Sequence, residues 1–191
     1  MDFAIDHRLD LTLLSGRAHY DRVVASVLEA ERSVWIATAN LKELLVEDAR
    51  AAPGRRRASS PGFRSVLEYL DELTGRGVEL RILHAGLPSR SFRETFDRLP
   101  ALVAGGLELR MCSRVHLKTV IVDGRLLYLG SANWTGAGLG VKRSARRNFE
   151  LGILTEDELV LDQVQALYQY IWQGDACPDC GLRESCEAPI A

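Results

Sequence analysis

Four polar side chains within eighteen residues have the types needed to bind and attack an anionic tetrahedral group. His116 and Lys118 alternate with apolar residues, and Ser131 and Asn133 follow a second apolar run. An ammonium group supplies a positive point charge, hydroxyl and amide groups donate hydrogen bonds, and an imidazole acts as a nucleophile or as an acid or base. This set predicts a site for chemistry on a phosphate-like group.

A β-hairpin is the element that would position these side chains. Asp123-Gly124 lies between two apolar runs, which is a strong signal for a two-residue turn. Side chains two apart in a strand share a face. A strand over Val115–Val122 would therefore direct His116 and Lys118 to the same side of the sheet.

The predicted turn also sets the register of the hairpin. With a two-residue turn, Val122 faces Arg125, and Ser131 lies directly opposite His116. Asn133 is then one diagonal step away, within about 7–8 Å. The hairpin is expected to gather all four polar groups in one patch.

At these positions the chain resembles the phospholipase D superfamily. The superfamily signature H-x-K-x4-D-x6-G-S-x-N is filled by His116, Lys118, Asp123, Gly130, Ser131 and Asn133. The order of predicted elements from about residue 18 to 172 is also similar to one catalytic repeat. The resemblance implies that the motif histidine attacks phosphorus to give a covalent phosphohistidine, without a metal. It implies that Lys118 and Asn133 hold the phosphoryl oxygens and that Ser131 supports them.

The resemblance assigns roles to three further residues. Members of the superfamily use a downstream carboxylate to orient the nucleophilic histidine, and here Glu150 supplies one. Fixing the ring through its second nitrogen sets its tautomer. Asp123 and Gly130 are expected to be structural members of the motif.

Only one copy of the motif is present. His7, His19 and His84 are the other histidines, and none has a lysine two residues later. The resemblance implies that a second motif histidine protonates the leaving oxygen. We therefore predict a homodimer in which two copies of His116 face each other across a twofold axis, as in small bacterial phospholipase D-like endonucleases.

The substrate class is indicated by local charge rather than by the total. The formal net charge is −2, but seven basic and two acidic residues lie between Arg114 and Glu150. A basic loop beside the motif could track a nucleic-acid backbone, or it could be a solvated loop; its cations are Lys142, Arg143, Arg146 and Arg147. Arg55–Arg57 could add to it. Trp134 could stack on a base or form a wall of the pocket.

Three cysteines near the carboxyl terminus have metal-ligand spacing. Cys177, Cys180 and Cys186 form a C-x2-C-x5-C pattern. Such a set can hold zinc, which prefers four ligands, and Cys112 or a histidine is the candidate fourth. An unliganded tail and a redox or iron–sulfur role are the alternatives. No cofactor is expected for catalysis itself.

The surrounding pattern predicts an α/β fold with a mixed sheet sandwiched between helices. Strands are predicted over residues 33–39, 78–84, 107–112, 115–122, 125–129 and 149–154, and helices over residues 20–30 and 63–73. Capping boxes at Ser91 and Thr155 predict two more helices. Residues 48–62 are rich in Pro, Gly, Ser and Arg and predict a loop. We expect a catalytic domain over 1–174 and a cysteine-rich tail over 175–191.

Composition limits the class of protein. The 191 residues are 47% hydrophobic and 26% charged, which is typical of a globular domain. No apolar stretch approaches the ~18–20 residues of a membrane span. The start of the chain lacks the pattern of a secretory signal, so a cytoplasmic protein is expected.

Three functions fit these features. The first is a metal-independent phosphodiesterase, an endonuclease acting on DNA or RNA. The second is a phospholipase D or phosphatidyltransferase that uses the same His116 chemistry. The third is a nucleic-acid-binding module without catalysis, for which His116 would be unnecessary.

Overall fold

A seven-stranded mixed sheet organises the chain. The computed structural model describes residues 2–47 and 62–190. Within them the sheet runs in the order β1-β9-β8-β7-β2-β5-β6. Its strands are β1 (Thr12–Ser15), β2 (Ser33–Thr38), β5 (Glu79–His84), β6 (Glu108–Met111), β7 (Thr119–Val122), β8 (Leu126–Gly130) and β9 (Leu151–Thr155). The β2, β5 and β6 strands are parallel, and the other pairs are antiparallel.

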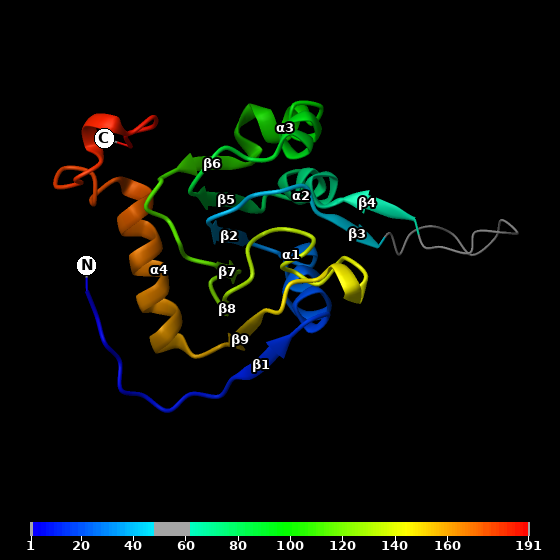
Figure 1. Ribbon diagram of the computed structural model, residues 1–191, viewed down its shortest axis with the longest axis horizontal. Helices are drawn as coiled ribbons and strands as arrows, with labels where there is room; N and C mark the ends of the chain where they lie inside the picture. The colour runs from blue at the N-terminus through cyan, green and yellow to red at the C-terminus, as the bar shows by residue number, and fades with distance from the viewer. Residues whose placement is uncertain (1, 48–61, 191) are drawn as a thin grey trace, which may run out of the picture.

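Helices cover both faces of this sheet (Figure 1). One face packs against α1 (Ala25–Leu28), α2 (Val66–Thr74) and α3 (Arg90–Phe96), and the other packs against α4 (Glu158–Gln173). The short helices are η1 (His19–Val24), η2 (Leu102–Gly106), η3 (Ser144–Arg146) and η4 (Arg183–Ser185). The predicted α/β class, with a mixed sheet between helices, is confirmed.

The alternation of apolar residues along the strands divides the core into two layers. In β2, Ile36 joins the cluster under α1 and α2, whereas Ala37 joins the cluster under α4. In β7, Val120 and Ile121 divide in the same way. Successive side chains of a strand point to opposite faces, so a sheet that is buried on both sides needs apolar residues at both.

Both predicted capping boxes are placed two residues away from the true helix starts. The α3 helix is capped by Ser89, whose Oγ accepts from the Phe92 N–H at 3.3 Å, so Ser91 lies inside the first turn. The α4 helix is capped by Asp157, whose carboxylate accepts from the Val160 N–H at 3.1 Å. The Thr155 hydroxyl donates to the Asp10 carbonyl instead, at 2.7 Å.

Three strands were missed by the prediction. The edge strand β1 pairs with β9, and β3 (Leu45–Glu47) pairs with β4 (Phe63–Ser65) in a separate two-stranded ribbon. Phe63, which we predicted to be helical, therefore lies in a strand. The α2 helix begins after Ser65, whose side chain caps it by accepting from the Leu67 N–H. These strands are too short to show an alternating pattern. The predicted loop 48–62, with Arg55–Arg57, lies outside the described residues except for Gly62.

Among the described residues, no helix has both the length and the apolar composition that crossing a bilayer requires. The α4 helix ends at Gln173 with Gly174 in the left-handed conformation, at φ 85°. Residues 175–190 follow as turns with one short 3-10 helix, η4.

Candidate active site

The segment that carries His116 and Lys118 is a loop, not the strand that we predicted. The β7 strand begins only at Thr119. A turn precedes it, in which the Val115 N–H donates to the Cys112 carbonyl at 2.9 Å. The alternation rule for strands therefore does not set the directions of His116 and Lys118, and that part of the prediction is wrong.

The register of the hairpin also differs by one residue. Asp123 and Gly124 are the central turn residues, with φ of 57° and 63°, and the Arg125 N–H donates to the Val122 carbonyl at 3.0 Å. Val122 nevertheless pairs with Leu126, so the connection between β7 and β8 contains three residues, Asp123–Arg125, instead of two. Ser131 is therefore not opposite His116.

The end of β8 connects the motif to both β7 and β9. The Gly130 N–H donates to the Lys118 carbonyl at 3.1 Å, and the Ser131 N–H donates to the Leu151 carbonyl at 2.9 Å. Gly130 pairs with Gly152. A Cβ on Gly130 would lie 2.7 Å from the Leu151 carbonyl oxygen, so this position requires glycine.

Ser131 and Glu150 form a hydrogen-bonded pair across this junction. The Ser131 hydroxyl donates to one oxygen of the Glu150 carboxylate, and the Asn148 amide donates to the other at 3.0 Å. Within the described residues, no hydrogen bond joins Glu150 to His116. Glu150 was predicted to orient the His116 ring, but here it orients Ser131.

Lys118 and His116 lie in the loop that precedes β7, and the Lys118 ammonium is near the Glu150 carboxylate. The Lys118 Nζ donates to the His116 carbonyl at 2.8 Å. Burial lowers the pKa of Lys118, and the nearby Glu150 carboxylate opposes that effect. The His116 side chain is exposed and forms no hydrogen bond within the part of the chain that the structure describes. The ring is therefore accessible to a substrate or to a second protein chain.

Asn133 is fixed by the end of β2. Its side-chain oxygen accepts from the Asn40 N–H at 3.0 Å. The Thr38 hydroxyl supports the same junction by accepting from the Trp134 N–H at 2.9 Å and donating to the Asn40 carbonyl at 2.9 Å. Because a backbone N–H can only donate, the Asn133 oxygen faces Asn40 and its NH2 group is left to donate to a bound group.

Asp123 connects the hairpin turn to the segment before β2. Its carboxylate accepts from the backbone N–H groups of Glu31, Arg32 and Ser33 at 2.7–3.2 Å. Burial acts to raise the pKa of Asp123, but these N–H donors outweigh it and lower the pKa. The carboxylate therefore ties the hairpin turn to the start of β2, away from the substrate side.

A groove opens beside Asn133, lined by polar and apolar side chains. Asn40, Lys42 and Glu43 come from the loop after β2, and Lys142 and Asn148 come from the segment between Asn133 and Glu150. The chain has three lysines, Lys42, Lys118 and Lys142. Two of them line the groove and the third belongs to the motif. Lys42 was missed, although the rarity of lysine in this chain was an available signal.

The other predicted substrate contacts are distributed differently. Arg143 and Arg146 are exposed around η3, and the Arg147 Nε donates to the Lys142 carbonyl at 2.6 Å, which fixes the loop. Trp134 is only 2% exposed and packs in the core under α1 and α2. The prediction that Trp134 stacks on a base or lines the pocket is therefore wrong, because neither contact is compatible with a buried ring.

The mixed seven-stranded sheet, with the histidine, lysine and asparagine of the motif gathered around β7 and β8, defines a phospholipase D-like catalytic repeat. The chain belongs to the phospholipase D family, since residues 24–172 match the family described as "Cardiolipin synthase, PLD-like domain". That family consists of enzymes that act on phosphodiesters. The resemblance inferred from the motif is confirmed.

Individual relatives support this assignment. The chain is 30% identical over 131 residues to cardiolipin synthase A of Pseudomonas entomophila, and 32% identical over 129 residues to that of Pseudomonas putida. These alignments cover 65% and 64% of this chain but 26% of each relative, so the chain spans about a quarter of their length.

Solved structures share the fold at lower identity. NucT from Helicobacter pylori has a TM-score of 0.58 and 15% identity, covering 85% of this chain and 94% of that one. Nuc from Salmonella typhimurium, a phospholipase D family member, has a TM-score of 0.58 and 17% identity, covering 85% and 95%. At this identity the similarity establishes the fold alone.

Proposed function

We propose that this protein is a metal-independent nuclease that cleaves DNA or RNA as a homodimer, through a covalent phosphohistidine on His116. The observation that carries the proposal is the groove beside Asn133, whose lining holds two lysines, Lys42 and Lys142, and one carboxylate, Glu43. These lysines are cations beyond the motif residue Lys118. A polyanion carries further phosphates on both sides of the scissile one, so cations beyond the motif favour a nucleic acid as substrate.

The first chemical step is attack by a neutral His116 ring on phosphorus. A nitrogen–phosphorus bond forms as the bond between phosphorus and the leaving oxygen breaks. His116 of the partner subunit, in its protonated form, gives its proton to that oxygen. Lys118 and the Asn133 amide stabilise the negative charge that accumulates on the phosphoryl oxygens.

The second step is hydrolysis of the phosphohistidine. The partner's His116, now neutral, takes a proton from water as the water oxygen bonds to phosphorus. The nitrogen–phosphorus bond then breaks and both rings return to their starting forms. Each active site therefore needs one imidazole ring as nucleophile and a second ring as acid and base. A chain with a single motif provides both rings only when it pairs with a second chain.

An exposed apolar surface beside the site supports the pairing of two chains. We call it the apolar edge patch; it consists of Leu11, Leu13, Phe149 and Leu151. Leu13 is 68% exposed and Leu151 is 61% exposed, and both lie on the sheet face that α4 covers further along. Phe149 directly precedes Glu150. Contiguous exposed apolar side chains of this kind are typical of an interaction surface.

A phosphatidyltransferase or phospholipase is the second candidate. It is favoured by the two cardiolipin synthases to which the chain is 30% and 32% identical. The apolar edge patch would then contact acyl chains rather than a second subunit. The polar groove with two lysines favours the nuclease, because a phospholipid carries few phosphates beyond the one attacked.

The deciding experiment offers both substrate classes to the same preparation in EDTA. We expect cleavage of single-stranded or duplex nucleic acid and no release of headgroup from phosphatidylcholine or cardiolipin vesicles. His116→Ala should abolish cleavage while binding is retained. Cleavage by His116→Ala would reject the mechanism, and headgroup release without nuclease activity would favour the second candidate. Binding without cleavage by the unaltered protein would identify a non-catalytic module.

Mixing subunits tests the homodimer. When wild-type and His116→Ala chains exchange, every site that contains one altered chain lacks a required ring. An equal mixture should therefore retain about a quarter of the wild-type activity, because both chains of a dimer must be intact. Activity that falls only to one half would show that each chain works alone. Leu13→Asp, which places a charge in the apolar edge patch, should give inactive monomers.

A further inference from the structure

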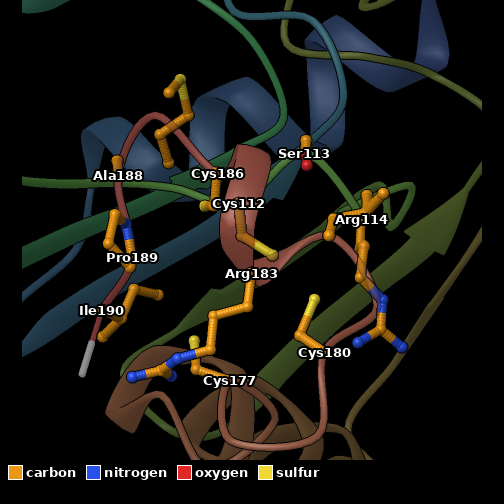
Figure 2. A pocket seen from close by; sticks show the side chains of 12 residues that line it. Cys112, Ser113, Arg114, Cys177, Cys180, Arg183, Cys186, Ala188, Pro189 and Ile190 are labelled. Carbon is orange, nitrogen blue, oxygen red and sulfur yellow. The ribbon is translucent and has the colours of Figure 1, made fainter.

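We propose that Cys112, Cys177, Cys180 and Cys186 form a structural zinc site that fastens the carboxyl-terminal tail to the catalytic loop. All four cysteines of the chain line a single cavity. Figure 2 shows them around it, with Cys112 from the segment after β6 and the other three from the tail. All four thiols are free in this structure. Nothing in the mechanism proposed for His116 uses them.

The tail provides a turn suited to gripping an ion. Cys177 and Cys180 are separated by two residues, and the Cys180 N–H donates to the Cys177 carbonyl at 3.2 Å. Two cysteines at this spacing form half of many tetrahedral zinc sites. The Cys180 thiol also accepts hydrogen bonds from the Leu182 N–H and from the Arg114 side chain. Such outer contacts are those that support a metal-bound thiolate.

The tail has no buried core of its own. All of residues 175–190 are described, and none of them is buried. Its backbone–backbone hydrogen bonds form local turns, such as Cys177 N–H to Gly174 carbonyl at 2.8 Å and Arg183 N–H to Cys180 carbonyl at 2.9 Å. A segment that cannot build an apolar core normally depends on a metal or on disulfides.

The charge around the cavity suits a zinc ion with four thiolates. Such a centre carries a net charge of −2, because four thiolates exceed the charge of one zinc ion. Arg114 and Arg183 line the same cavity and together supply two positive charges.

The sulfur atoms must approach one another when the ion binds. Within residues 2–47 and 62–190, no three His, Cys, Asp or Glu side chains already stand in a metal-binding arrangement. Metal binding and local folding are coupled in segments without a core. We therefore expect the tail to close toward Cys112 until each sulfur lies about 2.3 Å from zinc.

The position of Cys112 gives the site its consequence for the enzyme. The Cys112 N–H donates to the His84 carbonyl at 2.9 Å, at the end of β5, and Val115 three residues later is buried. His116 follows directly. A metal bound at Cys112 would therefore anchor the start of the loop that carries the motif histidine, which has no strand pairing of its own.

Metal content and cobalt spectroscopy test this site without any activity assay. The full chain, purified without oxygen and without chelators, is expected to hold one zinc ion per chain by mass spectrometry. Replacement by Co²⁺ should give the absorption of a tetrahedral ion with four thiolates. Cys112→Ser should weaken Co²⁺ binding by more than about 100-fold. Loss of a residue that only supports a metal ligand weakens binding by up to about 100-fold, so a larger loss indicates a direct ligand. Ser113→Ala, which alters the same cavity, is the matched control.

Several results would overturn the site. Wild-type protein with four freely titrating thiols and no metal would do so, as would disulfides in the intact mass or an iron–sulfur absorption spectrum. Cys112→Ser that binds Co²⁺ as tightly as wild type would remove the fourth ligand. If Cys112→Ser does not fold, the thiolate count of the wild-type Co²⁺ spectrum decides, because three thiolates or fewer contradict the proposal.

Discussion

The side-chain oxygen of Asn133 accepts a hydrogen bond from the backbone N–H of Asn40 at 3.0 Å, which fixes the amide with its nitrogen as the free donor. The contact joins the end of the motif to the loop after β2, 93 residues earlier in the chain. In the proposed mechanism, this contact positions the Asn133 NH2 group for a phosphoryl oxygen before the substrate binds. Donors that are fixed in advance stabilise developing charge without reorganising.

We expect Asn133→Ala to lower kcat by about 10²–10³-fold, the usual effect of losing one fixed donor. Asn133→Asp should be worse, because a carboxylate would repel the phosphate and cannot donate in its ionised form. Steady-state kinetics on an oligonucleotide measure both. Thr38→Val serves as the control that loosens the junction but leaves the amide. Equal activity of Asn133→Asp and Asn133→Ala would show that this side chain does not face the phosphoryl group.

The Ser131–Glu150 pair predicts a strong coupling between two substitutions. Ser131→Ala and Glu150→Ala should each lower kcat, since each removes one partner of the same hydrogen bond beside Lys118. The double variant should lose little more than the worse single variant, with a coupling energy of about 0.5–3 kcal/mol. Purely additive losses would indicate that Glu150 acts on His116 directly, as the superfamily resemblance implies, and not through Ser131.

The two groove lysines predict a change in salt dependence. Each phosphate contact contributes about 0.7–0.9 to the slope of log K against log salt. Lys42→Ala and Lys142→Ala should each reduce that slope by about this amount for a His116→Ala protein that binds without cleaving. Arg76→Ala, in the exposed turn after α2, should leave the slope unchanged. Unchanged slopes for both lysine variants would remove the groove from the binding surface.

The motif and the fold class could be predicted because both depend on local sequence. Asp123-Gly124 forms the turn that its residue types favour, β2 contains the apolar run Val34–Ala37, and β5 alternates apolar and charged residues at its start. The register could not be predicted, because the connection includes Arg125 as a third residue, which the Asp123-Gly124 pattern does not encode. Ser131 also bonds to the end of β9, a strand distant in the sequence.

Contacts between segments that are distant in the sequence could not be predicted either, because no local pattern encodes them. Lys42 lies 91 residues from Asn133 in the sequence and has no motif around it, yet both line one groove. Trp134 was placed in the pocket because it follows Asn133, whereas its ring turns into the core. Adjacency to a motif in the sequence therefore did not predict the direction of a neighbouring side chain.

Two buried histidines outside the motif predict how stability depends on pH. His19 and His84 are 0% and 5% exposed, and each ring shares a hydrogen bond through Nδ1 with a backbone carbonyl, of Gly16 at 3.2 Å and of Gly86 at 2.9 Å. Burial lowers the pKa of both rings below the ordinary value. The unfolded chain therefore binds more protons than the folded chain in mildly acidic solution, and the stability that the neutral rings contribute is lost as the pH falls.

We expect the free energy of unfolding to be level above about pH 7 and to decrease below the unfolded pKa of about 6.5, by at most about 1.4 kcal/mol per pH unit for each ring that stays neutral. Urea titrations at pH 5, 6, 7 and 8 measure it. His84→Asn keeps a donor for the Gly86 carbonyl but cannot be protonated, so its stability should fall less between pH 7 and pH 5. His116→Gln, which removes an exposed ring, should follow the wild-type profile. A His84→Asn profile as steep as wild type would show that the His84 ring is protonated as readily in the folded chain as in the unfolded one.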